Sequence, residues 1–174
     1  MVIIPPAYGN GLNGSSGTML GFVKPLGGKG VEFLYALADR LPDRQFLILR
    51  GEWKPCETIV EKPNITFIDP VADMKEFYER CRITLMPSLV EDAGTIPQES
   101  AANGIPCISS NVMGLPETNA GGIILPHDLN SWAAHIEMLD SPGFYNQTVD
   151  KQTAALVQFD WDKKFDELDR RIRA

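Results

Sequence analysis

The stretch EDAGTIPQESAANGIPCISS, residues 91–110, marks where a helix begins, where it ends and where the next strand starts. Thr95 opens a capping-box pattern, and Pro97 fits the first helical turn because its missing N–H is not needed there. Gly104 is a typical helix stop. The pattern therefore predicts a helix over residues 96–103, entered through a short loop.

Two glutamates frame the start of this helix. Glu91 lies in the loop before it and Glu99 in its early turns. The free backbone N–H groups of Gly94, Thr95 and Ile96 are expected between the two carboxylates. Amides at a helix N-terminus favour an anion such as phosphate, and carboxylates accept hydrogen bonds from sugar hydroxyls. The segment offers partners for both parts of a sugar nucleotide, although two solvated surface glutamates are the simpler alternative.

Short apolar stretches alternate with amphipathic helical stretches along the rest of the chain. This alternation predicts an α/β fold with one parallel sheet and helices on both faces. The expected strands are residues 18–23, 45–50, 65–68, 83–86, 106–109 and 122–125. The expected helices are residues 30–41, 73–80, 96–103, 116–119, 130–139, 147–158 and 161–171. Ligands bind at the carboxyl ends of such strands, so the loops that follow them are expected to line a site.

The bulk composition describes an ordinary acidic globular domain. The chain has 174 residues, 44% of them hydrophobic, a net charge of −7 and a pI near 4.8. The negative charge argues against nucleic acid or an anionic membrane as the main partner. Cys56, Cys81 and Cys107 show no CxxC spacing and indicate reduced thiols, with neither a disulfide framework nor a zinc site. We expect a cytoplasmic protein, because the first residues do not form a signal peptide.

Residues 1–17 are rich in proline, glycine and serine and are predicted to be a linker. Gly9, Gly11 and Gly14 spell the dinucleotide pattern G-x-G-x-x-G within it. That motif needs a strand before it and a helix directly after it, whereas here a strand follows. The glycines are therefore interpreted as a flexible loop.

Two lysines follow the first predicted strand. Lys24 and Lys29 flank a Pro-Leu-Gly-Gly turn, and Gly30 opens the next helix. Two cations beside helix N–H groups, in a loop where glycines allow close approach, are typical of a phosphate site. Solvated surface lysines are the alternative. Because this loop is expected at the same sheet edge as Glu91, the phosphate site is favoured.

Seven motifs follow one another along the chain. They are K-x-x-x-x-K-G (24–30), the strand ending at Gly51, NITFIDPV (64–71), PSLVEDAGTIPQESAANGIPCISS (87–110), MGLPE (113–117), GGIILPHD (121–128) and FDW (159–161). In this order they resemble the C-terminal, donor-binding half of a retaining glycosyltransferase of the GT-B fold. The family is the large one that includes glycogen synthases, of the glycosyltransferase family 4 type. The resemblance implies a Rossmann-like domain that binds a nucleotide sugar and needs no metal or other cofactor.

The resemblance also implies roles for particular residues. Lys24 and Lys29 would hold the donor's pyrophosphate and stabilise the leaving group, and Glu91 would lie beside the donor sugar as a catalytic residue. Glu99 would accept hydrogen bonds from the ribose hydroxyls. The remaining donor-binding residues would be Asp92, Ala93, Gly94, Thr95 and Ile96 around the sugar and phosphate, with Gly51, Ile68 and Val71 toward the nucleoside.

Three positions depart from the family pattern. Lys24 stands where arginine is usual, which removes a bidentate fork. Ala93 stands where an aromatic side chain is common, which changes the expected shape of the sugar pocket. Asp69 replaces a usual glycine beside the expected base contact.

The family's active site lies between two halves, and this sequence resembles one of them. Its VIIPP start resembles the crossover from the acceptor-binding half, so we expect a linker over 1–17 and a donor domain over 18–174. Helices within 147–171 are expected to pack toward the missing N-terminal half. The piece alone is expected to bind a UDP-, GDP-, ADP- or dTDP-sugar without transferring it, and the longer parent enzyme to associate peripherally with a membrane.

Two alternatives stay open from the sequence. One is a non-catalytic nucleotide-sugar-binding subunit that acts with a partner chain. The other is a sugar-nucleotide epimerase on the same fold, which would need an acid/base histidine in the cleft. His127 and His135 are not expected there on the predicted strand order. The base, the sugar, the acceptor and the oligomeric state are not encoded in any motif found.

Overall fold

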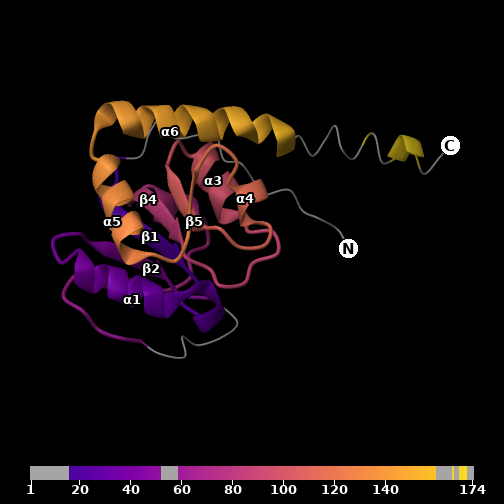
Figure 1. Ribbon diagram of the computed structural model, residues 1–174. Coiled ribbons are helices and arrows are strands. Elements are labelled where there is room, and N and C mark those ends of the chain that lie inside the picture. Colours follow the sequence, from indigo (N-terminus) through magenta and orange to yellow (C-terminus); the bar gives the residue numbers. More distant parts are fainter. Residues whose placement is uncertain (1–15, 52–58, 160–165, 167–168, 172–174) are drawn as a thin grey trace.

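The computed structural model describes residues 16–51, 59–159, 166 and 169–171. Six parallel strands form one sheet in the order β3-β2-β1-β4-β5-β6 (Figure 1). They are β1 Met19–Val23, β2 Phe46–Leu49, β3 Ile65–Ile68, β4 Cys81–Met86, β5 Cys107–Ser110 and β6 Ile123–Leu125. Each predicted strand is present with its ends within two residues, which confirms the Rossmann-like α/β fold. Most of the predicted linker, the glycine triplet and Cys56 lie outside the described residues.

Helices cover both faces of this sheet. They are α1 Val31–Arg40, α2 Lys75–Tyr78, α3 Ile96–Ala102, α4 Leu115–Thr118, α5 Leu129–Met138 and α6 Pro142–Ala155, with 3-10 turns η1 Gly27–Lys29 and η2 Leu156–Phe159. α1 and α5 pack together on one face, and α2, α3 and α4 lie on the other (Figure 1). α6 runs across one end of the sheet and contacts α3.

Alternate strand residues supply the two halves of the core. Leu20, Ile48 and Leu85 face α1 and α5, in the cluster that also contains the fully buried Trp132. The intervening residues, such as Leu49, face α2 in a second cluster. The central strands β2 and β4 are almost entirely buried, as expected for a parallel sheet covered on both faces.

Three local predictions need correction. Thr95 precedes α3 with a helical backbone and makes no side-chain capping bond, so the capping box is not formed. α6 begins at Pro142, well before the predicted residue 147, because Pro142 occupies the first helical turn after an extended Ser141 and does not break the helix. α2 is limited to Lys75–Tyr78 because the chain turns into β4 at Cys81.

The strand order places a crevice at one point of the sheet. The chain builds outward from β1 to β2 and β3, then crosses to β4, which pairs with β1 on its other side. The connections that leave the carboxyl ends of β1 and β4 therefore diverge to opposite faces. In sheets of this order a ligand binds in the gap between those two connections.

Candidate functional site

A cavity of about 240 Å³ opens at the carboxyl ends of β1 and β4. It lies at the point where the strand order reverses, so its position follows from the topology. Its walls come from the two strand ends, the η1 turn and the loop that leads into α3. The lining residues are Phe22, Val23, Lys24, Lys29, Leu85, Met86, Ser88, Glu91, Ala93, Gly94, Thr95 and Ile96.

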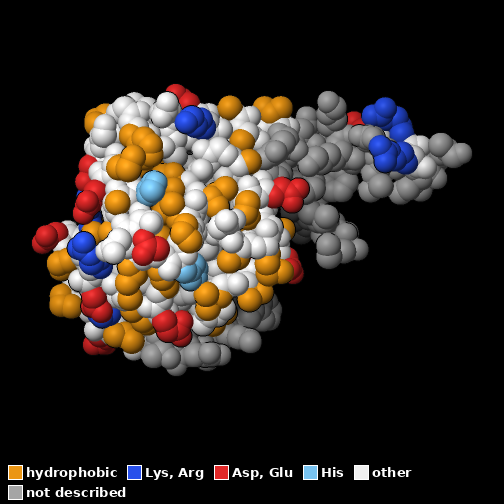
Figure 2. Space-filling model, in the orientation of Figure 1, with side chains coloured by type: hydrophobic (Ala, Val, Ile, Leu, Met, Phe, Trp, Pro, Cys, Tyr) orange, Lys and Arg blue, Asp and Glu red, His pale blue; other side chains and the backbone are white. Residues whose placement is uncertain are grey.

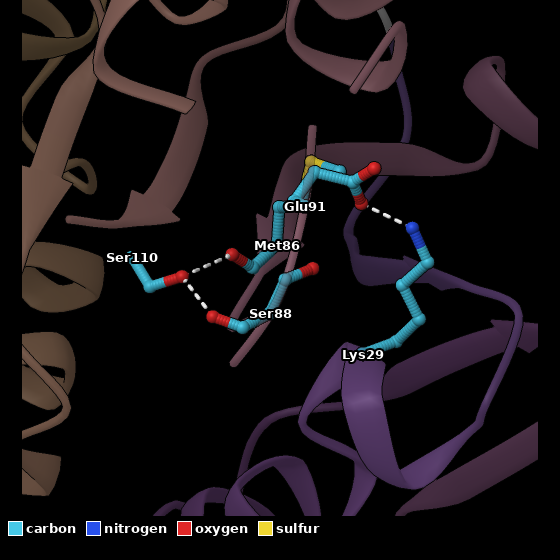
Figure 3. Close-up of polar contacts among 5 residues, drawn as sticks. All are labelled: Lys29, Met86, Ser88, Glu91 and Ser110. Atoms are coloured by element: carbon cyan, nitrogen blue, oxygen red, sulfur yellow. Dashed lines mark hydrogen bonds and ion pairs between the residues drawn. The ribbon is translucent and has the colours of Figure 1, made fainter. Parts of the chain in front are cut away.

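An ion pair crosses the cavity. The Lys29 ammonium, at the end of η1, contacts the Glu91 carboxylate in the loop after β4 (Figure 3). The two side chains are 29% and 12% exposed, so the pair is shielded from solvent on most sides. The two charges predicted to face a phosphate and a sugar therefore contact each other.

Close contact between two loops sets the position of this pair. The backbone N–H groups of Leu89 and Val90 donate to the Gly28 carbonyl over 3.0 and 3.3 Å. Gly30 has a φ of +80°, and a Cβ placed on it would lie 1.8 Å from the Pro87 carbonyl oxygen. A glycine is required there because any side chain would push the loops apart.

Lys24 lines the cavity directly after β1. It adopts a left-handed conformation with φ of +59°, while its N–H donates to the Leu49 carbonyl over 2.9 Å. The side chain is exposed and has no ion-pair partner among the described residues. Left-handed non-glycine residues cluster at functional sites, where the surrounding structure holds the strain.

The start of α3 forms another wall. Gly94 is buried, and a Cβ placed on it would lie 2.3 Å from the Met86 Cε atom. The N–H groups of Gly94, Thr95 and Ile96 have no hydrogen-bond partner among the described residues. They are donors available to a ligand that fills the cavity.

A serine pair supports the floor of the cavity. The Ser110 hydroxyl, on β5, donates to the carbonyls of Ser88 and Met86 (Figure 3). The Ser88 side chain is fully buried, yet its own hydroxyl has no hydrogen-bond partner. The sequence motif contains Ser88, but sequence reasoning gave it no role because a missing partner is visible only in three dimensions.

Glu99 is held by a tyrosine outside the cavity lining. The Tyr78 hydroxyl donates to the Glu99 Oε2 atom over 2.7 Å. Burial, followed by the nearby Glu99 carboxylate, raises the pKa of Tyr78 well above 10. The hydroxyl therefore stays protonated and remains a donor. Sequence reasoning missed Tyr78, since residues so far apart in the chain meet only through packing of α2 against α3.

The structure separates the predicted site residues into two groups. Lys24, Lys29, Glu91, Ala93, Gly94, Thr95 and Ile96 line the cavity together. Asp92, Glu99, Gly51, Ile68 and Val71 do not. Asp92 is exposed, and its carbonyl lies against Gly114. Ile68 and Val71 pack on the core cluster of α2, and Gly51 is half-buried after β2.

Neither histidine lines the cavity. His127 stacks on Phe33 with ring centroids 4.8 Å apart, and the His135 Nδ1 atom bonds to the Ser131 carbonyl. Figure 2 shows the pale blue histidine side chains on the α5 face of the molecule. The acid/base histidine that an epimerase needs is therefore not found in the cavity formed by the described residues.

The described part of the chain offers neither a metal centre nor a membrane-spanning helix. No group of three or more histidine, cysteine or acidic side chains there is arranged to hold a metal ion. Each helix within those residues is too short or too polar to cross a bilayer. Cys81 and Cys107 are both buried and unpaired.

Comparison with known proteins places the chain among glycosyltransferases. The sequence profile of the family described as glycosyl transferases group 1 matches residues 17–141. D-inositol 3-phosphate glycosyltransferase of Acidothermus cellulolyticus is 31% identical over 97 residues, which cover 53% of this chain and 22% of that protein. O-antigen chain mannosyltransferase B of Escherichia coli is 30% identical over 96 residues, covering 53% and 25%. The matched segment thus spans about a quarter of the length of these curated relatives.

Solved structures share the fold. The crystal structure of Anabaena Alr3699/HepE in complex with UDP-glucose superposes with a TM-score of 0.74 and 15% identity, covering 91% of this chain and 49% of that one. At this identity the similarity establishes the architecture alone. It confirms that the sheet and its helices are arranged as in one half of a GT-B enzyme.

Proposed function

This chain belongs to the glycosyl transferases group 1 family, and from that premise we propose that it is the donor-binding domain of a retaining, metal-independent glycosyltransferase. The observation that carries the proposal is the cavity in which Lys24, Lys29, Glu91 and unpartnered backbone N–H groups converge. These groups match the chemistry of a sugar linked to a diphosphate.

The proposed mechanism stabilises the leaving group. The ammonium groups of Lys24 and Lys29 would neutralise charge that develops on the nucleoside diphosphate as the glycosidic bond breaks. Glu91 would accept hydrogen bonds from the donor sugar, and the anomeric configuration would be kept. A cavity of about 240 Å³ is smaller than typical ligand pockets of ~300–1,000 Å³. The proposal therefore places the sugar and phosphates inside it and the nucleoside outside, toward Glu99.

UDP is the first nucleotide to examine, because the Anabaena structure was solved with UDP-glucose. GDP, ADP and dTDP sugars remain candidates. The acceptor, whether carbohydrate, lipid or protein, is assigned to a second half in a longer parent enzyme, which would work in the cytoplasm and associate peripherally with a membrane. The alternative, a non-catalytic subunit, would bind the same donor. A sugar-transfer assay on the parent protein distinguishes it from a glycosyltransferase, because only the enzyme would transfer the sugar.

A thermal-shift screen tests donor binding. The chain is heated with UDP, GDP, ADP, dTDP and their sugar conjugates, each at about a hundredfold the dissociation constant. Binding to the folded state alone should add about 2.7 kcal/mol of stability. Glu99→Ala should reduce the shift, since the ribose contact is lost. Equal shifts with unrelated anions, or none with any nucleotide, would contradict the proposal.

A further inference from the structure

Among the side chains of the described residues that line the cavity, the Ser88 hydroxyl is the one polar group that is buried without a hydrogen-bond partner. The residue has no exposed surface, and its oxygen atom makes no hydrogen bond within the described residues. Buried hydroxyls in folded proteins are nearly always paired, because an unpaired one loses its water without replacement. Such a group at a ligand cavity indicates a partner that arrives with the ligand.

The geometry fixes where that hydroxyl lies. Ser110 donates to the Ser88 carbonyl and to the Met86 carbonyl, so the backbone that carries Ser88 is anchored to β5. In Figure 3 the Ser88 hydroxyl points away from Ser110, toward the side on which Lys29 and Glu91 meet. Ser88 is among the residues that line the cavity, and its side chain is directed toward the side of the loop that carries the Lys29–Glu91 pair.

The charges of Lys29 and Glu91 indicate which kind of ligand atom would lie beside Ser88. The ammonium of Lys29 is neutralised by the Glu91 carboxylate. A phosphate oxygen can replace the Glu91 carboxylate as the partner of Lys29, because phosphate accepts several strong hydrogen bonds at once. An ammonium and a hydroxyl are both donors, which suits an anionic oxygen placed between them.

We infer that Ser88 is a further donor-binding residue, whose hydroxyl donates a hydrogen bond to a phosphate oxygen of the bound nucleoside diphosphate beside Lys29. This inference rests on the proposed function, and it adds a neutral donor to the two lysines. It also gives a role to the hydrogen bonds between Ser110 on β5 and the carbonyls of Met86 and Ser88, because they hold the Ser88 hydroxyl in place for a ligand.

Calorimetric titration of UDP and of uridine into the wild-type chain and Ser88→Ala tests the inference. We expect UDP affinity to fall about fivefold to tenfold in Ser88→Ala, a tenfold loss being about 1.4 kcal/mol. Uridine affinity should not change, since uridine has no phosphate. The melting temperature of unliganded Ser88→Ala should equal or exceed that of the wild type, because a hydroxyl without a partner is removed. If the screen selects guanine, GDP and guanosine replace these probes.

Ser100→Ala is the matched control. Ser100 is equally buried, but its hydroxyl bonds to the Ile96 carbonyl over 2.6 Å and to the Thr84 hydroxyl over 2.7 Å. We expect this variant to melt at a lower temperature and to keep its UDP affinity. Ser88→Ala should therefore lose UDP affinity and keep its melting temperature, whereas Ser100→Ala should keep UDP affinity and melt at a lower temperature.

The outcomes separate the inference from the function on which it rests. If the wild-type chain binds UDP and Ser88→Ala binds it equally well, the inference is overturned and the proposed function stands. Equal losses for UDP and uridine, or a drop in melting temperature like that of Ser100→Ala, also overturn it. If the wild-type chain binds no nucleoside diphosphate, the proposed function and the inference fall together.

Discussion

At the scale of single residues, Lys29 and Glu91 neutralise each other inside the cavity that we propose as the donor site. A half-buried pair of this kind contributes little net stability, because desolvation offsets most of the attraction. Its consequence lies in binding. Under the proposed function, a diphosphate would displace the carboxylate from the ammonium, and a sugar hydroxyl would then bind the released carboxylate.

Glu91→Gln separates the two proposed roles of Glu91, which are pairing with Lys29 and accepting a hydrogen bond from the donor sugar. The substitution removes the competitor for Lys29 and one negative charge, so UDP should bind roughly threefold more tightly. The additional affinity contributed by the sugar of UDP-glucose should shrink, because an amide accepts hydrogen bonds less strongly than a carboxylate. Calorimetry with UDP and with UDP-glucose measures both affinities, and their ratio gives the contribution of the sugar. The control is Asp39→Asn, which breaks the Lys62–Asp39 pair far from the cavity and should change neither affinity. Weaker UDP binding by Glu91→Gln would contradict this account.

Tyr78→Phe tests how Glu99 is positioned. It removes one donor to the Glu99 carboxylate and leaves the aromatic packing intact. If Glu99 binds ribose, UDP affinity should fall about fivefold, while 2′,3′-dideoxy-UDP should bind both proteins equally. Tyr145→Phe is the matched control, since its hydroxyl bonds to the Arg82 carbonyl away from the cavity. An equal loss for the dideoxy compound would show that Tyr78 supports the fold and not the ribose contact.

At the scale of elements, the η1 turn and the loop after β4 act as one unit. The Gly28 carbonyl accepts two N–H groups from that loop, and Gly30 packs on the Pro87 carbonyl. Gly30→Ala should destabilise the protein by about 3 kcal/mol or more, because it adds both backbone strain and a clash. Chemical unfolding measures the loss. Gly28→Ala, where a Cβ meets nothing within 4 Å, should have a much smaller effect. Similar losses at the two positions would show that the loops can separate freely.

The elements also show how far sequence reasoning reaches. The strands were predictable because each is a short apolar run bounded by turn residues, and the cavity position followed from parallel strand order. The start of α6 was not predictable, because a proline such as Pro142 can either break a helix or begin one, and the extended backbone of Ser141 before it is seen only in the structure. Likewise the Tyr78–Glu99 bond and the unpaired Ser88 hydroxyl depend on contacts between segments distant in the chain. Local sequence patterns carry no signal for such contacts.

At the scale of the whole molecule, two buried thiols make stability depend on alkaline pH. Burial raises the pKa of Cys81 and of Cys107 from 9.0 to about 12. Above pH 9 the unfolded chain releases protons that the folded chain keeps, so the free energy of unfolding falls as pH rises toward 12. The limiting slope is about 1.4 kcal/mol per pH unit for each thiol. Tyr78 adds to the same trend above pH 10.

Guanidinium unfolding at pH 8, 9 and 10 checks this expectation. Cys107→Ala should be less stable at pH 8, because a small buried group is lost, but its stability should fall less steeply with pH than that of the wild type. Parallel slopes for the two proteins would mean that the Cys107 thiol ionises alike in the folded and unfolded states.

The central claim is that a nucleoside diphosphate binds in the cavity between the ends of β1 and β4. The most direct measurement is a ¹⁵N NMR titration of the chain with UDP, or with whichever nucleotide the thermal screen selects. We expect saturable shifts in the amides of Lys24, Lys29 and Gly94 to Ile96, and none around the distant hollow formed by Asp39, Arg44 and Glu137. Loss of these shifts in Lys29→Met would assign the phosphate to that lysine. Shifts confined to the distant hollow, or none with any nucleotide, would contradict the account.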